Sequence, residues 1–379
     1  MRTIKPDTLQ IFSLRRLFIS IISIVLVTSS CGQSDSPTNI SPDEYVYNKP
    51  LTLDDGLNTD TLTNQGMNEE ASIEIIKEIL RDKFRKIDSI LIYRNNRLLM
   101  EEYFNGYHKD RVHDIRSATK SITSLLVGIA IDKGFISGVD QKVYDTVDQY
   151  GEIDNWDPSK ADINIEHLLT MSSGFECNGG WVMLDGKAVR LYGTDTWVKN
   201  LLDTPMRDIP GEVFSYCTGG IIALGEVIHQ SSQKPVDDFS REYLFEPLGI
   251  SNYRWEYSPI GEVDTGGHIY ITARDMLKIG KLVLQEGVWQ DKQIISKKWI
   301  EKSMQPYFGH YGYTWWRVGS LVENDNYLIY YADGNGGNRI FIVPRHDLIV
   351  VISGSNYNSE FGQASDYVLF SLILPQLDM

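Results

Sequence analysis

The chain has 379 residues with 36 Lys or Arg and 51 Asp or Glu, which gives a formal charge of −15. Because 42% of the residues are hydrophobic and 21 are tyrosines, the chain can bury a large core, which excludes a disordered or fibrous protein. The acidic balance, with no run of basic residues to offset it, excludes nucleic acid as a partner.

The first segment has the pattern of an export signal. Arg15 and Arg16 precede an apolar run over residues 17–27, and small residues then lead to Cys31. The run is too short to span about 30 Å of hydrocarbon as a helix. The residues before Cys31 resemble the lipobox of bacterial lipoproteins, although Thr28 stands where that pattern usually has Leu. We therefore expect residues 1–31 to be a lipoprotein-type signal peptide ending at a lipidated Cys31, with ordinary cleavage nearby or a retained anchor as the alternatives.

Residues 32–66 are rich in Ser, Asp, Asn, Thr and Pro and have no apolar period, so we expect a flexible tether. Signal and tether together predict an exported protein that a lipid anchor holds at the membrane of the bacterial cell envelope, on the periplasmic or outer side. Apart from Cys31, the cysteines are Cys177 and Cys217. Two thiols in an oxidising compartment often pair, and two separate buried thiols are the alternative.

The predicted folded domain covers residues 67–379. Apolar residues at three- and four-residue steps predict an amphipathic helix over about 68–88. Strand patterns at 89–93 and 98–104, joined by an Asn-Asn turn, then predict a hairpin.

A second helix is predicted to begin near Ser117 and to end at Gly134. Helices and loops with few strand signals follow, which we interpret as a helical insertion over about 140–260. Strand patterns return at 327–331, 340–343 and 349–353, and a closing helix is predicted at 364–374. The predicted fold class is α+β, an antiparallel sheet flanked by helices with a helical insertion.

Several common catalytic motifs are missing from the chain. It has no GxSxG, HExxH, GxxxxGK[ST] or GxGxxG. The seven histidines are scattered and none has metal-ligand spacing, so a Ser-His-Asp triad could assemble only in the folded chain.

The pattern Ser-x-x-Lys occurs twice, at Ser117–Lys120 and at Ser231–Lys234. A proline and polar residues around the second copy indicate a loop after a helix. Ser117 instead opens an apolar helix, where backbone N–H groups can stabilise an oxyanion and a lysine three residues on can reach the hydroxyl. A buried Lys120 could lose its proton and activate Ser117. An ordinary N-cap serine with a solvated lysine is the alternative.

Two further segments have residues suited to a site. Tyr216 follows a turn at the mouth of a predicted helix and could carry a proton, although a buried structural tyrosine is the alternative. Residues 333–338, with the sequence Asp-Gly-Asn-Gly-Gly-Asn, precede a strand. The glycines would let a substrate approach the backbone closely, and a plain tight turn is the alternative.

In their order along the chain, these segments resemble the serine β-lactamase and penicillin-binding-protein superfamily, in the class C-like branch that includes esterases and 6-aminohexanoate-oligomer hydrolases. Ser117-Ala-Thr-Lys120 matches the family's Ser-x-x-Lys, and Tyr216-Cys-Thr218 falls where the family has Tyr-x-Asn. Gly334-Asn-Gly-Gly337 falls where it has Lys-Thr-Gly or His-x-Gly. Four further stretches are similar to this branch: 165–174, 246–250, 272–276 and 341–344.

The resemblance implies a β-lactamase/transpeptidase-like fold and acyl transfer without a metal or cofactor. Ser117 would attack, Lys120 and Tyr216 would share the proton transfers, and the Ser117 and Gly337 N–H groups would form the oxyanion hole. The match also implies substrate contacts at Gly336, Asn335 and Thr218. Whether the lysine or the phenol is the acylation base stays open.

The departures from the family pattern bear on the substrate. Thr218 replaces an asparagine that contacts the substrate amide, and Gly334 replaces a lysine that receives a carboxylate. Because a free carboxylate loses its partner there, we expect an esterase- or amidase-type serine hydrolase acting on a small or peptide-like substrate. The alternatives are a peptidoglycan D,D-peptidase or weak β-lactamase, and an inactive cell-envelope binding module of the same fold.

Overall fold

A computed structural model of the chain describes residues 40–319 and 328–377. The predicted signal peptide, Cys31 and the first part of the predicted tether lie outside the described residues. Within the described ranges, no helix is both long and apolar enough to cross a membrane.

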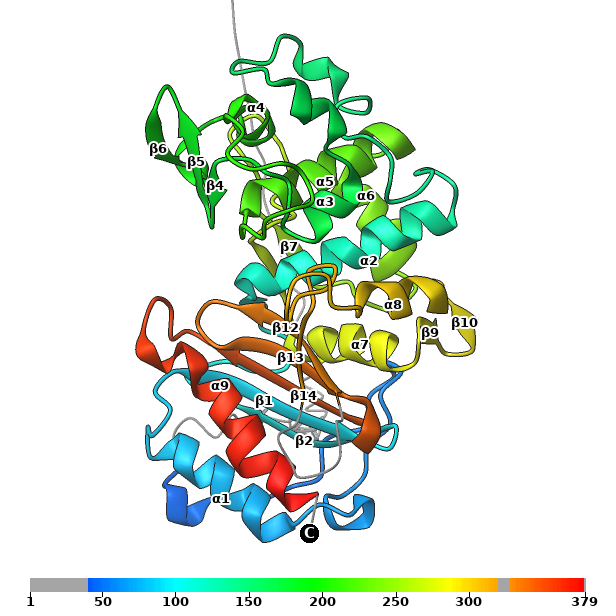
Figure 1. Cartoon of the computed structure of the whole chain (residues 1–379). Coiled ribbons are helices and arrows are strands. Elements are labelled where there is room, and N and C mark those ends of the chain that lie inside the picture. Colours follow the sequence, from blue (N-terminus) through cyan, green and yellow to red (C-terminus); the bar gives the residue numbers. More distant parts are fainter. Residues whose placement is uncertain (1–39, 320–327, 378–379) are drawn as a thin grey trace, which may run out of the picture. The chain divides into compact units, whose positions relative to one another are not determined.

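A six-stranded antiparallel sheet with the strand order β11-β12-β13-β14-β1-β2 forms the centre of the fold (Figure 1). Its strands are β1 (Ile87–Arg94), β2 (Arg97–Tyr103), β11 (Trp316–Gly319), β12 (Leu328–Gly334), β13 (Asn338–Val343) and β14 (Leu348–Gly354). The predicted hairpin is β1–β2. Its turn residues Asn95 and Asn96 have φ of 50° and 60°, the mirror-image turn that suits twisted strands.

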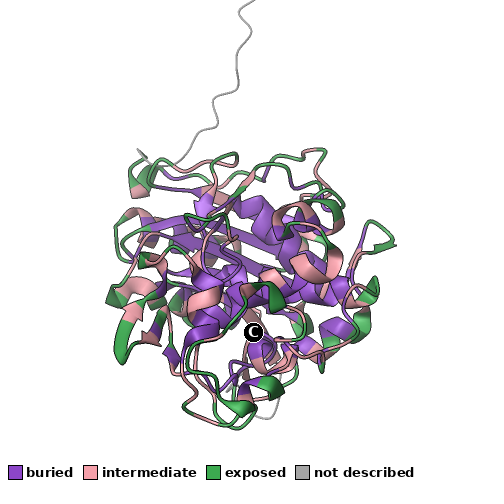
Figure 2. Ribbon diagram, turned by 90° about the horizontal axis from the view of Figure 1, so that it is seen from above, coloured by how far each residue is buried: buried purple, intermediate pink, exposed green. Residues whose placement is uncertain are grey.

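Both faces of the sheet are buried. On one face, Ile90 and Ile92 of β1 pack in a cluster with α1 (Glu69–Leu80) and the C-terminal segment that begins with α9 (Ala364–Tyr367). On the other face, the alternate residues Leu91 and Tyr93 pack in a cluster with α7 (Ala273–Leu284) and α2 (Thr119–Asp132). Figure 2 shows the strands and central helices as buried. Two buried faces explain why these strands are apolar at nearly every position.

A second region lies beyond α2, around α5 (Figure 1). Its helices are α3 (Ile165–Leu169), α4 (Trp197–Asp203), α5 (Thr218–Ser232) and α6 (Val236–Ser240). Another helix, α8 (Lys297–Ser303), follows a short hairpin of β9 (Val288–Trp289) and β10 (Lys292–Gln293).

The helical insertion predicted over about 140–260 also contains a few short strands, one of which pairs with a strand outside it. One three-stranded sheet consists of β4 (Cys177–Asn178), β5 (Trp181–Leu184) and β6 (Lys187–Arg190). Another joins β3 (His113–Asp114), β8 (Ile269–Ile271) and β7 (Tyr253–Trp255). Strands this short have too few alternating positions to give a period of two in the sequence.

The predicted helices form, but two of them are shorter than their apolar patterns. α1 ends at Leu80, since Asp82 and Arg85 have left-handed φ of 62° and 56°. A 3-10 turn over Arg116–Ala118 precedes α2, which stops at Asp132 just before Gly134. Left-handed residues end a helix by turning the chain away from its axis.

Candidate active site

Ser117 lies in the 3-10 turn that leads into α2. Backbone N–H groups in the first turn of a helix have no acceptor within the helix and carry a partial positive potential. The preceding residue, Arg116, has a left-handed φ of 53°, and its N–H donates to Asp114 Oδ1 at 3.0 Å. This strained turn, held by Asp114, places the Ser117 hydroxyl at the start of the helix.

Lys120 lies within hydrogen-bond distance of Ser117. Its Nζ lies 3.0 Å from Ser117 Oγ and also donates to the carbonyl oxygen of Gly266. The side chain is 1% exposed, and this burial lowers the lysine pKa to about 8, although Asp264 and Asp333 oppose the shift. A fraction of Lys120 is therefore uncharged at neutral pH and can accept the Ser117 proton.

Tyr216 lies beside the same pair. Lys120 Nζ is 5.0 Å from the centroid of its ring. Burial raises the pKa of Tyr216, and a hydrogen bond with Ser117 opposes part of the rise. The phenol therefore keeps its proton at neutral pH and can donate it or pass it on.

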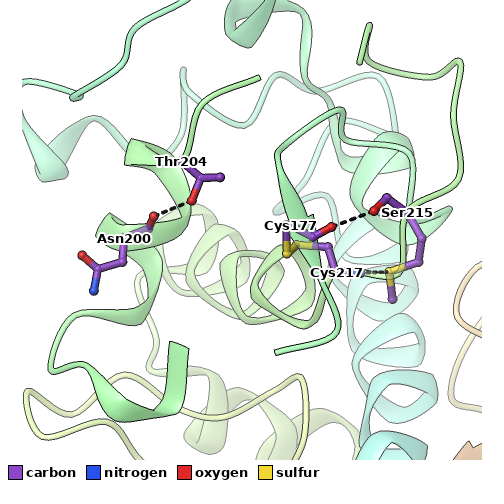
Figure 3. The surroundings of a disulfide bond; sticks show 6 residues. Cys177, Asn200, Thr204, Ser215 and Cys217 are labelled. Carbon is purple, nitrogen blue, oxygen red and sulfur yellow. Dashed lines mark hydrogen bonds between the residues drawn. A yellow bond between two sulfur atoms is a disulfide. The ribbon is translucent and has the colours of Figure 1, made fainter. Parts of the chain in front are cut away.

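The segment that carries Tyr216 is fixed on both sides. Cys217 forms a disulfide with Cys177 of β4, with 5.5 Å between the Cα atoms (Figure 3). Ser215 Oγ donates to the Cys177 carbonyl at 2.7 Å (Figure 3), and Thr218 N donates to the Gly179 carbonyl at 2.8 Å. The disulfide thus joins the small β4–β6 sheet to the segment of Tyr216.

Breaking this disulfide should affect both stability and turnover. We expect the Cys177→Ser/Cys217→Ser variant to lose roughly 4 kcal/mol of unfolding free energy, since the bond closes a loop of about 40 residues. We also expect a lower kcat, because Tyr216 loses its anchor. Urea unfolding and ester turnover measure the two effects. Ser215→Ala, which removes one hydrogen bond, should cost about 1 kcal/mol. Two titratable thiols from Cys177 and Cys217 in the unreduced, unfolded wild type would contradict the pairing.

A cavity of about 420 Å³ opens at Ser117. Of the residues predicted to form the site, Ser117, Tyr216, Thr218 and Asn335 line it. Lys120 lies behind this surface. The structure does not place Gly336 and Gly337 in the lining.

The two glycines instead shape the β12–β13 turn against its neighbours. A Cβ on Gly336 would lie 2.6 Å from Tyr357 Cδ1, and the Gly337 carbonyl accepts from Ser365 Oγ at 2.6 Å. Asn335 begins the same turn. Its backbone N–H has no acceptor among the residues that the structure describes, which leaves this donor free to meet a ligand.

Gly334 sets the approach of the sheet to Ser117. A Cβ at this position would lie 2.0 Å from the carbonyl oxygen of Ile115. Only glycine lets β12 lie directly against the turn that precedes Ser117, and this contact brings Asn335 to the cavity.

Sequence reasoning missed Asp264, which no motif marks. Its side chain is 0% exposed, and its Oδ1 accepts from Tyr192 Oη at 3.2 Å and from Gly266 N at 3.1 Å. Burial raises the pKa of Asp264 to about 6, although the charges of His268 and Lys120 oppose the rise. Above that pH, Asp264 places a buried negative charge near Lys120.

The structure also brings a serine, a histidine and an aspartate together away from the cavity. His113 Nε2 lies 2.9 Å from Asp88 Oδ2 and 3.4 Å from Ser355 Oγ, and the serine donates to the same carboxylate. The other ring nitrogen contacts the carbonyl of Asp114 at 2.9 Å. Because serine and carboxylate face one nitrogen, the histidine cannot link them as a catalytic triad does.

The second Ser-x-x-Lys pair has no catalytic geometry. Ser231 lies in the last turn of α5 and not in a loop, so that prediction is wrong. The helix continues to Ser232 and ends at Gln233, whose φ is 56°. Lys234 Nζ forms an ion pair with Glu242 at 2.9 Å, and an exposed pair of this kind offers no neutral amine.

The chain is similar in sequence to known proteins. Residues 74–371 match the profile of the family described as Beta-lactamase. The 6-aminohexanoate-dimer hydrolase of Paenarthrobacter ureafaciens is 23% identical over 290 residues, which cover 70% of this chain and 71% of that protein.

Solved structures share the fold. The octameric penicillin-binding protein homologue from Pyrococcus abyssi has a TM-score of 0.61 at 20% identity, covering 80% of this chain and 78% of that one. A class C beta-lactamase has a TM-score of 0.60 at 14% identity, covering 80% of this chain and 96% of its own.

Proposed function

Because the chain belongs to the Beta-lactamase family of serine hydrolases, we propose that it cleaves an ester or amide bond through an acyl-enzyme formed on Ser117. The predicted family and the predicted α+β fold are confirmed. The observation that carries the proposal is the buried amine of Lys120, 3.0 Å from Ser117 Oγ, with its pKa lowered to about 8.

In the proposed reaction, Ser117 Oγ attacks the carbonyl carbon while its proton moves to uncharged Lys120. Burial lowers the pKa of Lys120 and raises the pKa of Tyr216. The uncharged amine therefore forms more readily than the phenolate, which favours Lys120 as the group that accepts the Ser117 proton. Tyr216, hydrogen-bonded to Ser117, donates its proton to the leaving group as the scissile bond breaks and receives the proton held by Lys120, so both groups return to their starting states. Water then hydrolyses the acyl-enzyme.

For the oxyanion hole we propose the backbone N–H groups of Ser117 and Asn335. The resemblance had implied Gly337, but Asn335 lines the cavity and Gly337 does not. The free N–H of Asn335 and the helix-start N–H of Ser117 supply the two donors that a tetrahedral oxyanion needs.

We also propose that the protein is exported and that a lipid on Cys31 anchors it in the cell envelope. The support is the sequence pattern around Cys31 together with the Cys177–Cys217 disulfide. Disulfides persist in oxidising compartments and are rare in the cytosol.

A fluorophosphonate probe with intact mass analysis tests the proposed function. We expect one adduct on the wild type and none on Ser117→Ala, because Ser117 lines the cavity and has the amine of Lys120 within reach of its hydroxyl. Ser231→Ala and Ser355→Ala are matched controls that should label like the wild type. Labelling that survives in Ser117→Ala would overturn the assignment.

A further inference from the structure

The residues that line the cavity at Ser117 differ in composition from the acidic chain as a whole. Its lining includes Arg116, Arg190 and His268 and no Asp or Glu, although the formal charge of the chain is −15. Positive charge concentrated in a cleft attracts anions. Arg116 and His268 both contact the carboxylate of Asp114, which leaves Arg190 as the cation to consider.

The two arginines differ in their partners. Arg116 Nε forms an ion pair with Asp114 Oδ2 at 3.1 Å, and its guanidinium lies 4.3 Å from the centroid of the Tyr357 ring. Arg190 has no ion pair and no side-chain hydrogen bond with any residue of 40–319 or 328–377. The unbalanced cation of the lining is therefore Arg190.

Arg190 is placed together with an exposed aromatic side chain. It pairs directly with Trp181 across the β5–β6 hairpin, so the two side chains leave the same face of the sheet. Trp181 is 52% exposed and also lines the cavity. A large aromatic side chain that is half exposed and lines a cavity indicates a contact with a ligand.

The hairpin is held beside the reacting groups. Its sheet carries Cys177, whose disulfide partner Cys217 follows Tyr216 in the chain. The Gly179 N–H donates to the Tyr216 carbonyl at 2.5 Å. Arg190 and Trp181 thus belong to the wall that is anchored to Tyr216.

We propose that Arg190 binds a carboxylate of the substrate while Trp181 packs against the chain that links this carboxylate to the scissile ester or amide. The inference rests on the proposed function and specifies its substrate class. A guanidinium matches the two oxygens of a carboxylate with paired hydrogen bonds. A monoanion fits better than a phosphate, since one unpaired cation serves this wall.

The position of this cation differs from the one that the family resemblance implies. The resemblance located the family's carboxylate-binding lysine at Gly334, which has no side chain. In this chain the cation comes from a different element, the β5–β6 hairpin.

Two pairs of matched esters test the proposal. p-Nitrophenyl hydrogen adipate and p-nitrophenyl methyl adipate differ by one charge on the acyl side of the scissile bond. 4-Acetoxybenzoic acid and its methyl ester differ by one charge on the leaving-group side. The readout is the ratio of kcat/KM for the charged ester to that for the neutral ester, measured at low and at high salt.

For the wild type we expect a ratio of about ten in one of the two pairs, which falls as salt screens the charge. Arg190→Gln should reduce that ratio to about one, as expected when a charge-assisted hydrogen bond is lost. Lys187→Gln is the matched control, because Lys187 is an exposed cation on the same strand that does not line the cavity. This variant should keep the wild-type ratio.

The outcomes separate this proposal from the proposed function. If the wild type hydrolyses the neutral esters and shows no preference for the charged ester in either pair, the role of Arg190 is wrong and the serine hydrolase assignment still stands. A preference for the charged ester that persists in Arg190→Gln also overturns the role of Arg190 and leaves the serine hydrolase assignment standing. A wild type that hydrolyses none of the four esters and takes no fluorophosphonate overturns both.

Discussion

Replacing Lys120 by methionine should slow acylation of Ser117 by about three orders of magnitude, the range expected when a general base is lost. Methionine keeps an unbranched apolar stem in the buried site, so the chain should still fold. The burst phase of p-nitrophenyl acetate hydrolysis and the rate of fluorophosphonate labelling both measure acylation.

Lys160 provides a matched control for this variant. It is also fully buried, its Nζ donates to the Leu202 carbonyl at 2.7 Å, and burial lowers its pKa to about 8. Because Lys160 does not contact Ser117, Lys160→Met should lower the unfolding free energy and leave the acylation rate close to that of the wild type. Equal losses of acylation in the two variants would contradict a role for Lys120 as the base.

The same base predicts the pH dependence of acylation. The rate should rise as the pH increases through about 8, because the reactive form of Lys120 is the uncharged amine. Asp264 raises the pKa of Lys120, so Asp264→Asn should move this rise to lower pH while the amide keeps an acceptor for Tyr192. A rate that falls through the same range would mean that protonated Lys120 is required and that Tyr216 is the base.

Introducing a methyl group at Gly334 should impair both folding and turnover. The Cβ of Gly334→Ala would lie 2.0 Å from the Ile115 carbonyl oxygen and 3.0 Å from Asn338 Cβ. Backbone atoms cannot move aside by changing a rotamer, so β12 must shift away from the turn before Ser117. We expect a loss of about 3 kcal/mol in unfolding free energy. We also expect a fall in kcat, since Asn335 moves away from Ser117.

Urea unfolding and steady-state ester hydrolysis measure these two effects. Gly193→Ala is the matched control, because a Cβ there has no atom within 4 Å and its φ is not left-handed. That variant should stay within about 0.5 kcal/mol of the wild type. If Gly334→Ala were as stable and active as Gly193→Ala, the close approach of β12 to the Ser117 turn would be unnecessary.

The confirmed predictions depend on residues that lie close together in the sequence. The Ser117–Lys120 spacing is one helical turn, so any helix that starts there brings the two side chains together, and the structure places them 3.0 Å apart. The strands β1, β12, β13 and β14 are long and apolar, and their pattern in the sequence indicates them directly. The strands β4 to β6 have two to four residues each, and no local pattern indicates them.

The sequence by itself determined the helix that carries Ser117 and Lys120, every strand of the central sheet except β11, and the family to which the chain belongs. Only the tertiary structure left Gly337 out of the cavity lining, buried Asp264 near Lys120, and set Arg190 in that lining. The reason is physical. Helix and strand patterns depend on neighbours along the chain, whereas burial, pKa shifts and the charge of a cleft depend on groups that only packing brings together.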